Sequence, residues 1–235
     1  MADLFVRAHD VGRSFRQGDA EIPALLPATF AIGAGERIAI VGPSGSGKST
    51  LLHLIADLDR PTQGEIEWPA LGARGTLRPA QIGIVFQAPS LIPTLTAQEN
   101  VELPLRLMGG VPNLSELAKQ ALTKVQLDDV ASKLPSELSG GQMQRIAVAR
   151  AIALRPRLVL ADEPTGQLDQ PTAQKVIDAL LDSLAGTDAT LVVTTHDPAV
   201  AARMGSVWHM EHGQLLIQRQ GGLAPSSTAD MEDKR

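Results

Sequence analysis

The sequence contains no cysteine, so disulfide bonds and thiolate metal ligands are excluded. A chain without cysteine fits a reducing compartment such as the cytoplasm. A secretory signal is not expected either, because residues 1–10 lack a basic head followed by an apolar run. These absences together predict a cytoplasmic location.

Long apolar runs and an excess of basic charge are also missing. No run approaches the roughly 18 apolar residues that a membrane-spanning helix needs, and the stretch 146–154 is broken by Arg150. We therefore expect no direct membrane insertion, and any action on a membrane requires a partner protein. The net charge of −5 gives no support for a nucleic-acid surface, so no nucleic-acid partner is predicted.

Aromatic residues are scarce, at 3% of the chain, whereas the rest of the composition is ordinary. Of the 235 residues, 43% are hydrophobic and 20% charged, as in soluble globular proteins. This length is enough for one α/β domain with a small appended lobe, and it can bury a substantial core without covalent staples.

Strand and helix patterns alternate at both ends of the chain, which predicts a mostly parallel sheet. A short continuous apolar run such as residues 37–41 is typical of a buried parallel strand. Residues 4–15 and 24–32 read as two strands around a polar turn at 17–21, and they predict an antiparallel β region at the N-terminus. Further strand patterns cover residues 82–86, 158–161, 190–195, 207–211 and 214–218, and helix patterns cover 48–57, 140–154, 171–184 and 198–204.

A longer helical pattern covers residues 96–126 and predicts an inserted helical region. Thr96, with Glu99 three residues later, forms the pattern of a capping box at its start. We expect Pro104 and the pair Gly109 and Gly110 to divide this stretch into at least two helices.

Residues 42–50 match the phosphate-binding loop pattern G-x-x-x-x-G-K-[ST]. Glycines allow the backbone to turn its N–H groups toward phosphate oxygens, and the following helix adds its positive end. Lys48 supplies a cation for the terminal phosphates, and Ser49 supplies a hydroxyl for Mg²⁺, which prefers oxygen ligands. The residues that we assign to the nucleotide here are Gly42, Pro43, Ser44, Gly45, Ser46, Gly47, Lys48, Ser49 and Thr50.

A second element of the site is the apolar run 158–161, which is followed by two carboxylates. The end of such a strand lies at the edge where open α/β sheets bind ligands. We assign Asp162 to the nucleotide and the Mg²⁺ shell, and Glu163 to the attacking water as catalytic base. Two acidic residues after a strand are a weak signal alone, and the phosphate loop makes it specific.

Residues 138–142 (Leu-Ser-Gly-Gly-Gln) resemble the signature motif of the ATP-binding cassette (ABC) family. Ser139 is placed to cap a helix that begins at Gly140, and with Gly141 and Gln142 it forms a second anion-binding helix N-terminus. A chain with one phosphate loop and two such sites is explained most simply if the second site serves the ATP of another copy. We therefore predict a second ATPase subunit as partner, in a homodimer with ATP at each interface.

The resemblance assigns further residues by their place after matching motifs. Gln87 follows the strand 82–86 as the catalytic and Mg²⁺-binding glutamine does, and His196 follows the strand 190–195 as the histidine that contacts the γ-phosphate does. Asp169 corresponds to the aspartate at the dimer interface, which contacts the nucleotide site. Phe15 lies at the place of the aromatic that stacks on adenine, with a core phenylalanine as the alternative interpretation.

The resemblance extends over residues 4–218 and implies an α/β fold of the P-loop NTPase type with ATP and Mg²⁺ as cofactors. It implies one ABC ATPase domain over residues 1–219, with a core of about 1–86 and 156–219 and a helical subdomain of about 87–155. The Gly-, Ser- and Pro-rich residues 220–235 are predicted to be disordered.

Within the family, residues 96–105, 136–142 and 161–169 resemble the bacterial branch of lipoprotein release, macrolide efflux and cell division. Two departures are Gln167, where the branch generally has Asn, and the short stretch 68–81, which lacks the usual helix. The branch implies integral membrane permease subunits as partners and a peripheral location on the inner face of the membrane. Export or extraction of a substrate is expected, with force transmission of the cell-division type as the alternative.

Overall fold

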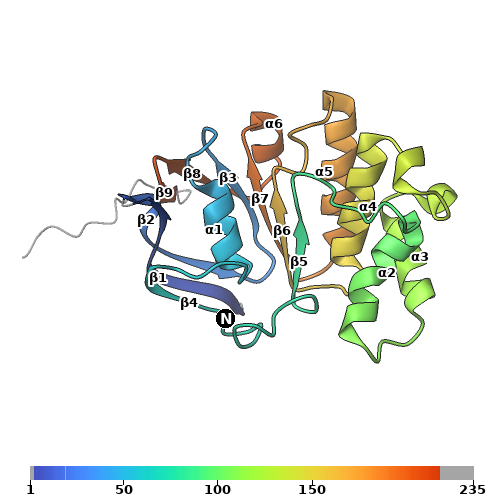
Figure 1. The fold of residues 1–235 in the computed structure, drawn as a ribbon, viewed down its shortest axis with the longest axis horizontal. Coiled ribbons are helices and arrows are strands. Elements are labelled where there is room, and N and C mark those ends of the chain that lie inside the picture. Colours follow the sequence, from blue (N-terminus) through green and yellow to red (C-terminus); the bar gives the residue numbers. More distant parts are fainter. Residues whose placement is uncertain (1–2, 19, 218–235) are drawn as a thin grey trace, which may run out of the picture.

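The computed structural model describes residues 3–18 and 20–217, and its central element is a six-stranded sheet (Figure 1). The strand order is β5-β6-β7-β3-β8-β9, in which β9 alone pairs antiparallel to its neighbour. The predicted disordered stretch 220–235 lies outside the described residues. The strands of this sheet are β3 (Arg37–Val41), β5 (Ile82–Val85), β6 (Leu158–Asp162), β7 (Thr190–Thr195), β8 (Ser206–Glu211) and β9 (Gln214–Ile217).

A second, antiparallel sheet holds β1 (Leu4–Gln17), β2 (Ala20–Gly33) and β4 (Gln63–Glu67) in the order β2-β1-β4. The predicted N-terminal hairpin is confirmed, but its turn is shorter than expected, because pairing continues as far as Gln17 opposite Ala20. The β4 strand was not predicted, since Ile66 is its one apolar residue.

The buried strands have apolar residues on both faces because both faces are covered. In β3, Ile38 and Ile40 pack in the cluster that holds the apolar residues of α1 (Lys48–Ile55) and of the antiparallel sheet. Ala39, which points the other way, belongs to the cluster of α4 and α5. Figure 1 shows this layering, with α1 and the antiparallel sheet on one side of the parallel strands and the remaining longer helices on the other.

The helical region is inserted in the chain between β5 and β6, as the sequence predicts, and these two strands are paired neighbours in the sheet. Its helices pack on α5 and on one face of the sheet, so one hydrophobic core joins them to the strands. The helices after α1 are α2 (Ala97–Met108), α3 (Leu114–Lys124), α4 (Gly140–Ile152), α5 (Gln170–Leu184) and the short α6 (Pro198–Ala201).

The start of α2 confirms the capping-box prediction, since the Thr96 hydroxyl accepts from the Glu99 N–H at 3.2 Å and the Thr96 N–H donates to the Glu99 carboxylate at 2.8 Å. The expected break at Pro104 is wrong. The helix continues through it because Val101 and Leu105 on either side are fully buried, and their packing outweighs the hydrogen bond that proline removes.

The linker between β4 and β5 forms turns over residues 68–81, without the helix usual in the branch. Across residues 3–18 and 20–217, no helix combines the length and apolar character needed to cross a bilayer.

Candidate nucleotide-binding site

The phosphate loop joins β3 to α1 and is packed too tightly for side chains at two of its glycines. A Cβ on Gly42 would lie 2.1 Å from the Met210 carbonyl oxygen, and one on Gly47 would lie 2.3 Å from the Ala24 carbonyl oxygen. Gly47, at φ +104°, occupies the N-cap of α1 and offers no side-chain cap. The first N–H groups of α1 are therefore free to bind an anion.

Two side chains of the loop fit a phosphate ligand. The Lys48 ammonium donates to the carbonyl oxygens of Gly42 and Pro43 at 2.9 and 3.0 Å, so the lysine folds back over its own loop. The Ser46 hydroxyl is buried without a hydrogen-bond partner among the described residues. A buried polar atom without a partner is costly, so this hydroxyl is suited to a bound phosphate oxygen.

Oxygen ligands meet where β6 ends beside the loop. The Asp162 carboxylate is buried, and its Oδ1 accepts from the Ser49 hydroxyl at 3.1 Å and from the Thr194 hydroxyl at 2.6 Å. A carboxylate beside a hydroxyl is a donor set that suits a hard cation such as Mg²⁺. Asp162 and Ser49, assigned to Mg²⁺ from sequence, are therefore direct neighbours.

Glu163 lies at the centre of the predicted catalytic residues. Its carboxylate is 3.3 Å from the Lys48 ammonium through Oε1 and 3.5 Å from the His196 imidazole through Oε2. A Cβ on Gly166 would lie 3.4 Å from Glu163 Oε2 and 3.5 Å from Gln87 Nε2, so the glutamine lies on the same side. The structure thus brings Glu163, His196 and Gln87 together.

The backbone of Glu163 adopts φ +41°, which is uncommon for a residue with a side chain. Such conformations cost about 1–3 kcal/mol and persist where neighbouring contacts hold them. Here the Glu163 N–H donates to both the hydroxyl and the carbonyl oxygen of Thr194, at 2.9 and 3.1 Å.

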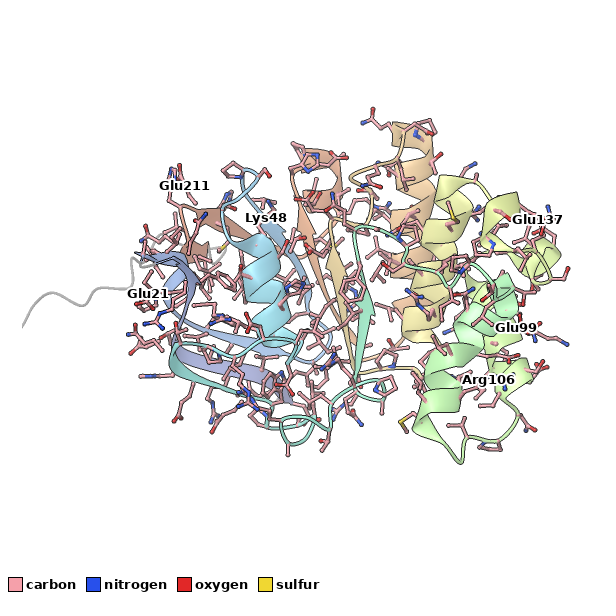
Figure 2. The ribbon with its side chains drawn as sticks, viewed as in Figure 1. Glu21, Lys48, Glu99, Arg106, Glu137 and Glu211 are labelled. Atoms are coloured by element: carbon pink, nitrogen blue, oxygen red, sulfur yellow. The ribbon has the colours of Figure 1, made fainter. Side chains whose placement is uncertain are left out.

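The 138–142 motif lies away from the phosphate loop in the folded molecule. Figure 2 shows Lys48 on α1 far across the molecule from Glu137, which is two residues before Ser139. Ser139 caps α4 as expected: its hydroxyl accepts from the Gln142 N–H at 3.2 Å, and its N–H donates to the Gln142 side chain at 2.9 Å. One copy of the chain therefore does not bring this helix end to its own phosphate loop.

Gly141 is buried against Thr172, and a Cβ at this position would lie 2.1 Å from Thr172 Cγ2. This contact joins the start of α4 to the start of α5, where Asp169 is the N-cap. The Asp169 carboxylate accepts from the Thr172 N–H and hydroxyl at 2.9 and 3.0 Å. These hydrogen bonds hold the pKa of Asp169 below its usual range. The remaining motif residue, Gly140, is exposed.

Phe15 lies on β1 with 44% of its surface exposed, so the alternative of a core phenylalanine is wrong; stacking on adenine stays a prediction. Its cross-strand partner Ile22 is similarly exposed. The Arg13 guanidinium lies 4.4 Å from the Phe15 ring centroid and is bonded twice to Asp59, at 2.8 and 3.0 Å. Sequence reasoning missed Arg13 and Asp59, because residues so far apart in the chain show no shared pattern.

A strand, a glycine loop, a lysine at the start of a helix and a carboxylate pair at the same sheet edge define a P-loop NTPase. A family profile described as "ABC transporter" matches residues 25–166, and the chain belongs to this family. The family resemblance and the fold class expected from the motifs are therefore confirmed.

Individual relatives agree over most of the chain. The lipoprotein-releasing system ATP-binding protein LolD of Legionella pneumophila (strain Paris) is 42% identical over 226 residues, which cover 93% of this chain and all of that protein. The dimeric ATP-binding cassette MJ0796, in a post-hydrolysis state bound to ADP and Pi, matches with a TM-score of 0.80 and 38% identity, over 91% of this chain and 97% of that one. CbiO1 from Clostridium perfringens, part of the ABC transporter complex cbiONQ, matches with a TM-score of 0.79 and 26% identity, over 92% of this chain and 88% of that one.

Proposed function

We propose that this chain is the ATP-hydrolysing subunit of an ABC transporter and that two copies close around two Mg-ATP. The observation that carries the proposal is the cluster of Lys48, Glu163 and His196 at the phosphate loop, whereas Glu137, which precedes the capped helix α4, lies far from Lys48 across the molecule (Figure 2). A second copy can bring its own Ser139 to the first copy's nucleotide. The relative MJ0796 is a dimer with ADP and Pi, which supports this arrangement.

The phosphates are held by the loop of residues 42–50. The N–H groups at the start of α1 bind phosphate oxygens, and Lys48 exchanges its carbonyl partners for the terminal phosphates. Ser49 and Asp162 would hold magnesium together with Gln87, which follows the end of β5. When bound, the ion offsets phosphate charge during the reaction.

Hydrolysis is assigned to the residues around Glu163. Its carboxylate orients the attacking water and accepts the water's proton, and the exposed His196 contacts the γ-phosphate. Gln87 lies beside them and positions the water. The left-handed backbone of Glu163 aims its side chain back toward Lys48.

The dimer closes because both copies contact the γ-phosphate, one through Lys48 and the other through Ser139, Gly140, Gly141 and Gln142. ATP therefore favours the closed dimer, and loss of the γ-phosphate releases it. Asp169 lies beside that helix end and contributes to the interface. Phe15 stacks on adenine, with Arg13 and Asp59 holding its ring.

The helical subdomain of about residues 87–155 transmits this closure from the core of about 1–86 and 156–219 to membrane permease subunits. The chain is then peripheral to the inner face of the membrane. The relative LolD is named for lipoprotein release, which supports export or extraction of a substrate. The cell-division alternative is not favoured by these relatives.

The test is Glu163→Gln, with Glu65→Gln, on the exposed face of β4, as the matched control. Glu163→Gln should bind ATP, form a long-lived dimer by light scattering and lose turnover, because the amide accepts no proton. Glu65→Gln should behave as the wild type. Turnover at the wild-type rate contradicts the assigned base, and a Glu163→Gln chain that stays monomeric with Mg-ATP contradicts the dimer.

A further inference from the structure

We propose that Thr194 is a positioning residue that sets the orientation of both Asp162 and Glu163, an inference that rests on the proposed function. Thr194 lies on β7, the strand between the one that leads into the phosphate loop and the one that ends in the two carboxylates. In the strand register it is the direct partner of Asp162. We assign Thr194 no contact with the phosphates, and it acts through Asp162 and Glu163.

The Thr194 hydroxyl is used twice. It donates its proton to Asp162 Oδ1 at 2.6 Å, and its oxygen accepts the Glu163 N–H at 2.9 Å. The side chain is fully buried, so water does not compete for either bond. One hydroxyl therefore connects the side chain of the magnesium ligand to the backbone of the catalytic base.

Asp162 needs such a bond because the terminal torsion of an aspartate is broad and does not select one orientation by itself. Its Oδ1 accepts from Thr194 and from Ser49, which belong to different elements. Two donors on one oxygen fix the carboxylate plane relative to the phosphate loop. Without Thr194, the carboxylate is held from the loop side alone.

Glu163 needs the second bond because its left-handed backbone is unfavourable for a residue with a side chain. Its N–H is shared between the hydroxyl and the carbonyl oxygen of Thr194. Removal of the hydroxyl takes away one of the two acceptors. The backbone conformation that orients the Glu163 side chain is then held by the carbonyl oxygen of Thr194 alone.

A comparison within β7 separates this role from plain stability. Thr190 is equally buried on the same strand, and its hydroxyl donates to the Gly33 carbonyl oxygen at 2.6 Å, at the far end from the site. Valine has the same branched shape as threonine and favours strands equally. Thr194→Val and Thr190→Val thus remove one buried hydroxyl each with matched packing.

The experiment compares the full-length wild type, Thr194→Val, Thr194→Ser and Thr190→Val. The readouts are thermal melting, kcat and KM for ATP, and the Kd for ATP with and without magnesium. We expect Thr194→Val to lower kcat by about 10- to 100-fold, as loss of a partner of a metal ligand does, and to raise KM for Mg-ATP to the extent that magnesium contributes to ATP affinity. It should also lose most of the gain in ATP affinity that magnesium gives. Thr194→Ser should restore both, and Thr190→Val should lower the melting temperature alone.

If Thr194→Val folds and keeps both the wild-type kcat and the wild-type gain in ATP affinity from magnesium, the inference is overturned. The proposed function is not affected by that result. Equal losses in Thr194→Val and Thr190→Val also overturn it, because the effect is then structural. If the wild type itself does not hydrolyse ATP, the proposed function fails and the inference with it. Should Thr194→Val not fold, Thr194→Ala against Thr190→Ala gives the same comparison.

Discussion

The Lys48 ammonium and the Glu163 carboxylate form an ion pair, with 3.3 Å between Nζ and Oε1, and the same ammonium donates to two carbonyl oxygens of its own loop. An ammonium has three donors, so the lysine has a full set of partners inside the site. A phosphate must displace one of them. Glu163 carries the same sign of charge as the incoming phosphate and therefore competes with it.

We expect Glu163→Gln to bind ADP more tightly than the wild type, by about two- to fivefold, which corresponds to the worth of a partly exposed ion pair. ADP is the appropriate ligand because it lacks the γ-phosphate that drives dimer closure. The measurement is a calorimetric titration without magnesium at low protein concentration. Unchanged or weaker binding of ADP would show that Glu163 does not compete with the phosphate for the Lys48 ammonium.

Local signals in the sequence predicted the strands of the described residues except β4, and they predicted the arrangement of the strands only in part. The bounds of β3 and β7 agree with the expected ranges, because each is an apolar run between polar residues. The order of six strands depends on contacts between distant segments, which no local pattern contains. Pro104 shows the same limit, since the burial of its neighbours overrides its local tendency to break a helix.

The site divides in the same way. The phosphate loop is contiguous, so its glycines and Lys48 could be assigned directly from their spacing. Thr194 stood in a predicted strand, but the bonds of its hydroxyl depend on β7 lying beside β6. The pairing of Arg13 with Asp59 likewise follows from the hairpin meeting the segment after α1.

The capping boxes of α2 and α4 have nearly the same geometry, and this gives a test of the second phosphate site. Ser139 and Thr96 each accept at 3.2 Å from the residue three positions later. Replacement of either by alanine should cost about 1 kcal/mol of stability, the usual worth of an N-cap. Only Ser139→Ala should weaken the ATP-dependent dimer, because only that helix end is proposed to face the partner's nucleotide.

The measurement pairs thermal melting with light scattering of each variant in the Glu163→Gln background, where ATP is not consumed. Thr96→Ala is the control for the loss of a cap. If both variants dimerise with ATP as readily as the parent, the helix end at Ser139 does not contribute to the interface.

Gly141→Ala should disrupt the junction of α4 and α5 through one steric overlap, since the added Cβ would lie 2.1 Å from Thr172 Cγ2. Overpacking of this kind costs about 1–3 kcal/mol, which melting should detect, and the ATP-dependent dimer should weaken as the helix end moves. Thr172→Ser removes that methyl group but keeps the hydroxyl that donates to Asp169, so the double variant should recover both properties. Gly140→Ala is the matched control for stability alone, because a Cβ there meets Leu168 at an ordinary 3.7 Å while the residue itself belongs to the proposed dimer interface. If the double variant remains as unstable as Gly141→Ala, the need for glycine at this position has a cause other than Thr172.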